Sequence, residues 1–437
     1  MRDTPAGPPS SELWPTLLAF LHFFLIIFSY YIIKPVRDAL FIKTIGPDRL
    51  PYFYLAVAGV VLLVVAIYNQ LLRRFDSRRF VVALQGVVAL NILAFWWLMA
   101  AGHRISTAFY IWASVYNVLM VTLFWSLTND LFDSASGRRH YGVIGGGGIV
   151  GGIVGGLATR YLPAWIGTTH CLLPAAGVML LTLPVTLARL ARPLADGARG
   201  AAEPRAGAER SARDVTARRE PREPPESSSA WRDFHLVWSQ RNVRLITQIV
   251  FFVTLAKTLF NYHYYHVIDA TILGTDATTA FFGTVNAASN ISSAVLQFLV
   301  TTWVLRRFGA RVGLLFLPLV LLSALGLLLF PQGLLVIASL NVAQQSTSYS
   351  INQSSKELLY TPCTEAVKYR SKAVIDMFVF RFGDAFAALV LLVLHTYLHL
   401  PAWTSIAVGS LCTAYWLTVI LRAEDPTRVI GSAGGSP

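Results

Sequence analysis

Ionisable side chains lie inside several apolar stretches of this sequence, and their chemistry needs an explanation. Lys257 is well inside the apolar stretch 242–267. A charged group inside a membrane helix is costly, so it must pair, line water or lose its proton. We expect Lys257 to bind an anionic solute. The alternative is a structural salt bridge to another helix.

Lys34 and Arg37 follow the first apolar run at a spacing of three residues, which places them on one face of a helix. Two cations on one face suit an anion better than lipid, so we expect both to bind the solute. The alternative is that their charged ends extend to the membrane surface. Asp38 is assigned to coupling or gating. Because it is adjacent to Arg37, we expect the two side chains to point to different sides and not to neutralise each other.

Further charges accompany the later apolar segments. Asp376, Arg381 and Asp384 lie in an otherwise apolar run, and a spacing of three would let Arg381 pair with Asp384. We expect Arg381 to bind the solute, and Asp376 and Asp384 to couple or gate its movement. Asp130 and Glu357 lie near segment ends. They form either gate salt bridges to arginines or ordinary solvated ends.

The run Asn-Tyr-His-Tyr-Tyr-His at 261–266 is unusually polar and aromatic for a membrane span. Tyr262, Tyr265 and His266 share a helical face. Such rings stack on planar solutes or contact cations, so we expect Tyr262 and His266 to bind the solute. The alternative is an aromatic belt at the membrane interface.

Glycines recur every fourth residue in two series that begin at 147 and 148. Small residues at this spacing let membrane helices approach closely, so the series predict helix packing. A phosphate-binding loop is excluded, because no Lys-Ser or Lys-Thr follows and no strand precedes. The members are Gly147, Gly151, Gly155, Gly148, Gly152 and Gly156.

Catalytic and metal chemistry lack a matching set of residues. Cys171, Cys363 and Cys412 are far apart, and the sequence has no CxxC motif or Cys/His cluster. No nucleophile–base arrangement is recognisable either. We therefore expect a protein that is not an enzyme and has no metal and no cofactor.

The composition fits a chain surrounded by lipid. Of the 437 residues 55% are hydrophobic and 14% charged, whereas soluble domains carry roughly 25% charged residues. The net charge of +13 comes largely from short connections between apolar segments, which indicates membrane topology and not a nucleic-acid partner.

Apolar segments long enough to span a bilayer, about 20 residues, divide into two groups of six. We therefore predict an all-α membrane protein with twelve transmembrane helices in two halves, 14–191 and 233–422. A charged linker, 192–232, separates them, and tails occupy 1–13 and 423–437. The segments are 14–33, 51–72, 80–101, 106–127, 142–163, 169–191, 242–267, 278–304, 309–330, 331–352, 372–397 and 400–421.

Lys and Arg concentrate on alternate connections, such as 73–79 and 305–311, while 164–168 has none. The positive-inside rule then places both termini and the linker in the cytoplasm, and we expect a bacterial inner membrane. The connection 34–50 breaks the pattern with four basic residues. We interpret Lys34 and Arg37 as continuing the first helix toward a water-filled path.

An internal repeat relates the two halves. Three pairs align without gaps and a fourth after a slip of one residue: Phe28/Phe260, Tyr30/Tyr262, Lys34/His266 and Asp38/Asp269. Two repeats in the same direction are the plan of the major facilitator fold, whose solute site lies near mid-membrane between the halves.

Several motifs resemble the nucleotide-transporter family, the ATP/ADP translocases of plastids and intracellular bacteria. They are Arg37-Asp38, the stretch from Phe124-Trp125 to Asn129-Asp130, the glycine-rich region 141–152 and Lys372-Ala-Val-Ile-Asp376. The resemblance suggests a divergent bacterial member of this family within the major facilitator superfamily.

The resemblance implies exchange of adenine nucleotides, with Arg37 as the family's helix 1 cation and Asp130 as its helix 4 acid. This chain has Gly383-Asp384-Ala385 where the family commonly has Gly-Lys-Ser. Arg381, one turn earlier, is the candidate to replace the missing lysine.

We therefore expect a secondary active transporter that works by alternating access as a monomer and moves an anionic, nucleotide-like solute such as ATP or ADP. One alternative is a proton-coupled major facilitator carrier of a different small solute. The other is a membrane scaffold that transports nothing.

Overall fold

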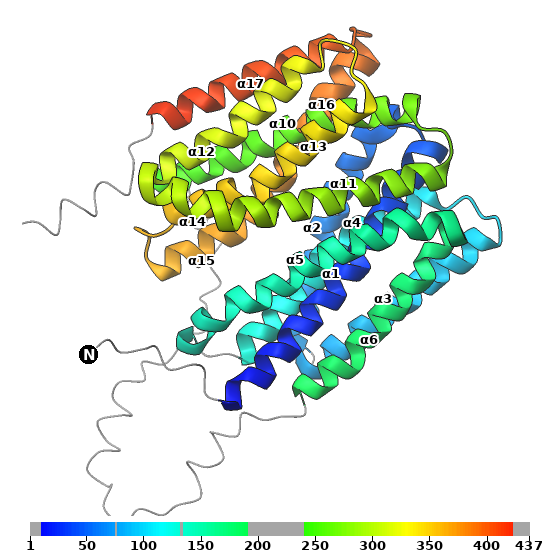
Figure 1. Ribbon diagram of the computed structural model, residues 1–437, viewed down its shortest axis with the longest axis vertical. Coiled ribbons are helices and arrows are strands. Elements are labelled where there is room, and N and C mark those ends of the chain that lie inside the picture. Colours follow the sequence, from blue (N-terminus) through cyan, green and yellow to red (C-terminus); the bar gives the residue numbers. More distant parts are fainter. Residues whose placement is uncertain (1–9, 75–76, 132–133, 191–239, 423–437) are drawn as a thin grey trace, which may run out of the picture.

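The computed structural model describes residues 10–74, 77–131, 134–190 and 240–422, and the regular elements of this part are helices (Figure 1). Ten helices in it are long and apolar enough to cross a membrane. The prediction of an all-α membrane protein is confirmed.

Within the described residues from 10 to 190, the first part of the chain has six long helices joined by short connections. Two of these connections contain single 3₁₀ turns, Pro47–Arg49 and Thr169–Cys171. The helices are α1 (Ser10–Thr44), α2 (Leu50–Arg74), α3 (Ser77–Ala100), α4 (Ser106–Leu131), α5 (Ser134–Ile166) and α6 (Leu172–Leu190).

Helix α1 continues well beyond the predicted segment end at 33, through Lys34 and Arg37 to Thr44. It does so despite Pro35, which cannot donate a hydrogen bond to the carbonyl of Tyr31 one turn earlier. The hydroxyl of Thr159 in α5 donates to that carbonyl at 3.0 Å. A neighbouring helix therefore satisfies the group that proline leaves open.

The second part of the chain is also helical, but π-helical turns interrupt it. The α-helices are α10 (Arg241–Thr271), α11 (Thr275–Val295), α12 (Thr302–Leu327), α13 (Leu334–Thr347), α14 (Gln353–Leu359), α15 (Glu365–Val374), α16 (Phe380–Leu391) and α17 (Trp403–Arg422). The π-helical turns are Leu296–Thr301, Ser348–Asn352, Ile375–Val379 and Leu392–Tyr397.

Two stretches of the second part explain why ten candidate spans are found where the sequence predicts twelve. Thr275–Leu327 counts as one span, although Gly309 breaks it with a φ of +81°, a conformation that glycine adopts without strain. Leu334–Leu359 is also continuous helix, but its many amides and hydroxyls make it too polar to be included.

Three hydrophobic clusters organise the packing. One is built from α1 and α3–α6, with Tyr68 of α2, and another from α10, α12 and α17 with the turns around Leu359 and Ile375. The third joins α1, α2 and α4 to α10, α11 and α16. In Figure 1, α1, α3, α5 and α6 lie together, α10, α12, α13 and α17 lie together, and α11 runs beside α5 between them.

The first glycine series of α5 packs against the backbone of α1. A Cβ atom on Gly151 would lie 2.6 Å from the carbonyl oxygen of Phe24, and one on Gly155 would lie 2.8 Å from that of Phe28. Gly147 meets the carbonyl of Phe20 in the same way. Only hydrogen fits at these three positions.

The second series is shared between two neighbours. Gly148 contacts the ring of Phe23 in α1. A Cβ on Gly156 would lie 2.7 Å from the backbone nitrogen of Ala287 in α11, and one on Gly152 would lie 2.9 Å from Asn290. The glycines thus bring α5 close to α1 on one side and α11 on the other.

Replacing Gly151 with alanine should lower the melting temperature of the purified protein, because the methyl group overlaps a backbone atom that cannot move aside. Overpacking of this kind costs about 1–3 kcal/mol. The matched control is Gly145→Ala, since a Cβ there meets nothing within 4 Å. Equal melting temperatures for the two variants would contradict this packing role.

Candidate functional site

A cavity of about 450 Å³ lies between the two parts of the chain. Its walls come from α1, α2 and α4 on one side and from α10, α11, α13, α14 and α16 on the other. The four cations selected from the sequence all line it: Lys34, Arg37, Lys257 and Arg381. The carboxylates of Asp38 and Asp384 line it as well.

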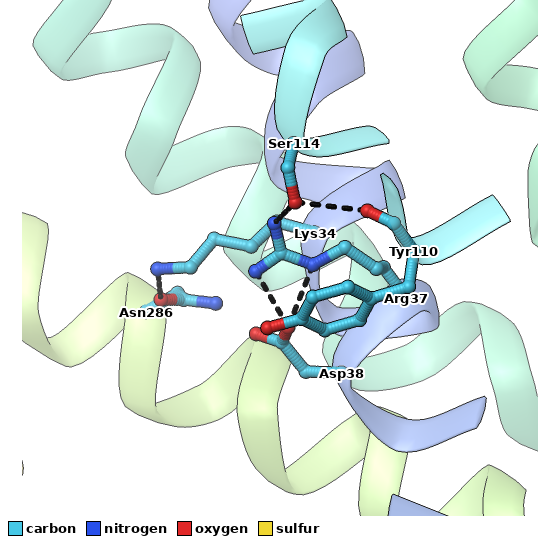
Figure 2. Close-up of polar contacts among 6 residues, drawn as sticks. All are labelled: Lys34, Arg37, Asp38, Tyr110, Ser114 and Asn286. Atoms are coloured by element: carbon cyan, nitrogen blue, oxygen red, sulfur yellow. Dashed lines mark hydrogen bonds and ion pairs between the residues drawn. The ribbon is translucent and has the colours of Figure 1, made fainter. Parts of the chain in front are cut away.

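Arg37 and Asp38 form an ion pair, contrary to the expectation that adjacent side chains point apart (Figure 2). The guanidinium donates to Oδ1 of Asp38 at 2.6 and 2.8 Å, because the long arginine side chain bends toward its neighbour. It also donates to Ser114 at 3.1 Å and lies 4.8 Å from the ring centre of Tyr110. Helix α4 thereby holds Arg37 in place.

The two lysines have neutral partners. Lys34 donates to the side-chain oxygen of Asn286 in α11 at 3.1 Å, which links the two parts of the chain (Figure 2). Lys257 donates to the hydroxyl of Ser348 at 3.5 Å and lies 5.5 Å from the ring centre of Tyr349. Neither bond neutralises the lysine charge, so both ammonium groups are available to an anion.

Helix α16 supplies the predicted local pair. Arg381 lies 3.6 Å from Asp384, whose other oxygen accepts a hydrogen bond from Thr258 of α10 at 2.8 Å. Asp384 therefore holds Arg381 beside the cavity and ties α16 to α10. The side chains of Asp130 and Asp376 lie outside the part that the structure describes.

Of the two alternatives for Glu357, an arginine salt bridge or a solvated end, the structure has neither in full: the partner is a lysine. Lys372 of α15 donates to both carboxylate oxygens of Glu357 at 2.7 and 2.8 Å. The chain turns back between α14 and α15, so these two residues, fifteen positions apart, become neighbours. Glu357 does not line the cavity.

The aromatic run of α10 presents a different face from the one predicted. Asn261, Tyr264 and Tyr265 line the cavity, whereas Tyr262 and His266 do not. Tyr262 stacks on His395 with 5.5 Å between ring centres. Because each residue turns a helix by about 100°, a shift of one position selects a different face.

A different register of the predicted repeat fits this face. The cavity residues Tyr30 and Lys34 of α1 correspond to Asn261 and Tyr265 of α10. The same difference in residue number relates Asp38 to Asp269. The ungapped alignment, which matched Lys34 with His266, differs from it by one residue.

Polar contacts between the two parts gather where α1 ends at Thr44 and α10 at Thr271, which we call the tied end. Lys43 forms an ion pair with Asp269 at 2.6 Å. His266 lies 3.4 Å from Asp48. These contacts hold the two parts together beyond the cavity.

A third contact belongs to the tied end. The hydroxyl and backbone N–H of Thr168, between α5 and α6, donate to Asp276 of α11 at 2.6 and 2.7 Å.

Sequence analysis did not identify several lining residues as part of the site. Lys356 lines the cavity because it continues the helical face of Ser348 and Asn352. Polar residues of α13, α14 and the turn between them share that face, and their helical spacing is the signal in the sequence that indicates it. They are Asn341, Gln344, Gln345, Ser348, Asn352 and Gln353.

Solved structures with the same fold are membrane transporters. The nucleoside transporter NupG superimposes with a TM-score of 0.62 at 13% identity, over 95% of this chain and all of that one. The peptide transporter PepTSo gives 0.60 at 12% identity, over 95% and 97%. These likenesses show that the chain shares the fold of these proteins.

The family is shown by the sequence itself. The TLC ATP/ADP transporter model matches residues 83–338, more than half of the chain, so this protein belongs to that family. A relative, ADP,ATP carrier protein 1 of Chlamydia muridarum, is 21% identical over 89% of this chain and 84% of its own. The protein of the same name from Chlamydia trachomatis is 26% identical over about a quarter of each chain.

Replacing Asp38 with asparagine should destabilise the protein, because it leaves the Arg37 charge unpaired. Loss of one partner of a buried pair costs about 3–5 kcal/mol. The Asp38 side chain is 3% exposed. The matched control is Asp269→Asn in the ion pair with Lys43, where the carboxylate is 38% exposed and the loss should be about 1 kcal/mol or less.

Thermal melting in detergent measures both variants. The double variant Arg37→Gln/Asp38→Asn should be more stable than the sum of its single changes predicts. A double variant whose loss of stability equals the sum of the two single losses would contradict a direct interaction between Arg37 and Asp38.

Proposed function

We propose that this family member is a secondary active carrier that exchanges anionic nucleotides of the ATP/ADP type by alternating access. The observation that supports this most strongly is the convergence of Lys34, Arg37 and Lys257 in one cavity between the two parts of the chain. These residues come from helices that are distant in sequence, and a phosphate chain is long enough to contact several of them.

The charge balance of the cavity supports an anionic solute. Its described lining has five basic residues and two acidic ones: Lys34, Arg37, Lys257, Lys356 and Arg381 against Asp38 and Asp384. The lining therefore carries a formal charge of +3. Buried charges of one sign raise the local concentration of a counter-ion and bind it more strongly than in water.

The two carboxylates have a role in release. Asp38 occupies Arg37, and Asp384 faces Arg381, when no phosphate is present. An incoming phosphate competes with these carboxylates for the guanidinium groups, because arginine binds both in the same forked geometry. The two arginines thus stay paired when the cavity is empty, and the carboxylates return to them as the solute leaves.

The helices fit twelve membrane crossings in two halves of six, 14–191 and 233–422. Ten candidate spans become eleven when Thr275–Leu327 is divided at Gly309. The polar helix Leu334–Leu359 is the twelfth. We propose that this polar stretch crosses the membrane because its neighbours and the cavity surround it, so that lipid does not contact its amides.

We further propose that both termini and the 192–232 linker lie in the cytoplasm, which the distribution of basic residues favours, and that the protein works as a monomer in the inner membrane of a bacterial cell. The tied end then faces outward and the cavity opens inward. Breaking the Lys43–Asp269 and His266–Asp48 contacts would open the outer side. That change is the rocking of one half against the other.

Transport of labelled ATP into proteoliposomes preloaded with ADP tests the proposal. We expect uptake that depends on internal nucleotide and needs no ATP hydrolysis. Lys34→Gln and Lys257→Gln should each reduce the uptake rate about 10- to 100-fold, the value of one or two charge-assisted hydrogen bonds. Lys368→Gln is the control, because Lys368 does not line the cavity.

One outcome would reject the nucleotide as the solute, and another would reject the cavity as its binding site. If no nucleotide moves but a proton gradient drives another solute, the protein is a proton-coupled carrier. Asp384→Asn should then abolish the uptake of that solute. If Lys368→Gln reduced the uptake rate as much as Lys34→Gln and Lys257→Gln, the cavity would not be the binding site of the solute.

A further inference from the structure

One wall of the cavity is neutral and has a chemistry of its own. Helix α13, the π-helical turn Ser348–Asn352 and α14 place amides and hydroxyls along a single face, at spacings of three, four, seven and eleven residues from Asn341. Lys356 follows at the end of this row. Amides offer donors and acceptors side by side, which suits a planar heterocycle better than a phosphate.

Two acceptors in this wall are unsatisfied. The side-chain oxygens of Gln344 and Asn352 are buried and have no hydrogen-bond partner among the described residues. Gln344 is 1% exposed and Asn352 is 6% exposed, and both line the cavity. A buried acceptor without a partner is unfavourable, so these positions are built for a group that arrives with the solute.

The remaining amides of the row are occupied differently. Gln345 donates to Asn341 within the helix, and Gln353 donates weakly to Glu357 at 3.5 Å. The side-chain oxygens of the described row that are both buried and without a partner are those of Gln344 and Asn352.

An unsatisfied oxygen needs a hydrogen-bond donor. An ionised phosphate has only acceptors, so it cannot complete these two sites. The N–H groups of a nucleobase or the hydroxyls of a ribose can. Lys257 reaches this wall at Ser348, between the two positions. A phosphate held there leaves the neutral part of the solute beside the amides.

We propose that Gln344 and Asn352 form a subsite for the nucleoside part of the solute, and that they determine which nucleotide is exchanged. The proposal rests on the nucleotide carrier function proposed above. The cations recognise the phosphates and give affinity to any nucleotide, while the two amides distinguish its uncharged part. A site built for hydrogen bonds discriminates strongly against solutes that lack them.

Competition in proteoliposomes separates the two contributions. Uptake of labelled ATP is measured against increasing unlabelled ATP, and separately against inorganic tripolyphosphate, which has the phosphates without the nucleoside. The variants are Gln344→Met and Asn352→Leu, which keep the side-chain size and remove the polar atoms. Gln332→Leu is the control, because Gln332 is in an exposed turn away from the cavity.

Each variant should raise the concentration of ATP needed for half-inhibition about tenfold and leave that of tripolyphosphate within about twofold. An unchanged value for ATP overturns the subsite. An equal rise for both competitors overturns it too, since the amides would then act on the site as a whole. If wild-type protein moves no nucleotide at all, the proposed function fails first and the subsite with it.

Ligand-induced thermal stabilisation in detergent gives a second readout that does not need transport. Ligands that bind the folded state raise its melting temperature. ATP should stabilise the wild type more than either variant, while tripolyphosphate should stabilise all three equally. Because the two variants lie on different turns of the helix, one of them can be measured even if the other fails to fold.

Discussion

The central constraint on this protein is the high free energy of an unpaired charge inside a membrane. Lys34, Arg37, Lys257 and Arg381 cannot face lipid, so the helices that carry them must enclose a polar space. The long α1 helix, the neutral wall of α13 and α14, and the carboxylates of Asp38 and Asp384 all follow from that need.

Close packing beside the cavity answers a second need. Alternating access requires helices that remain in contact while the two halves change their angle. The glycines of α5 bring it close to α1 and α11, directly against backbone atoms at Gly147, Gly151, Gly155 and Gly156. By contrast, the tied end is held by a few polar contacts such as Lys43–Asp269, which break and re-form in the proposed transport cycle.

The proposed site divides recognition between charge and hydrogen bonding. Cations from α1, α10 and α16 attract an anion over a distance, and their attraction changes little with its identity. In the proposed subsite the amides act only at contact and in fixed directions. A carrier that must admit one nucleotide and reject others of equal charge needs both kinds of wall, because electrostatics alone does not distinguish them.

The sequence by itself determined the membrane class, most segment positions, the packing glycines and the four cations that meet in the cavity. Those features depend on composition and on spacing along one helix. The tertiary structure decided the Arg37–Asp38 pair, the Lys372 partner of Glu357, the cavity face of α10 and the inclusion of Lys356 and the amides. Such features depend on how each helix is rotated about its axis, and an error of one residue in position changes that rotation by about 100°. They also depend on partners that are far away in sequence. A periodic pattern shows that a helix has a polar face, but only the packed neighbours show what that face meets.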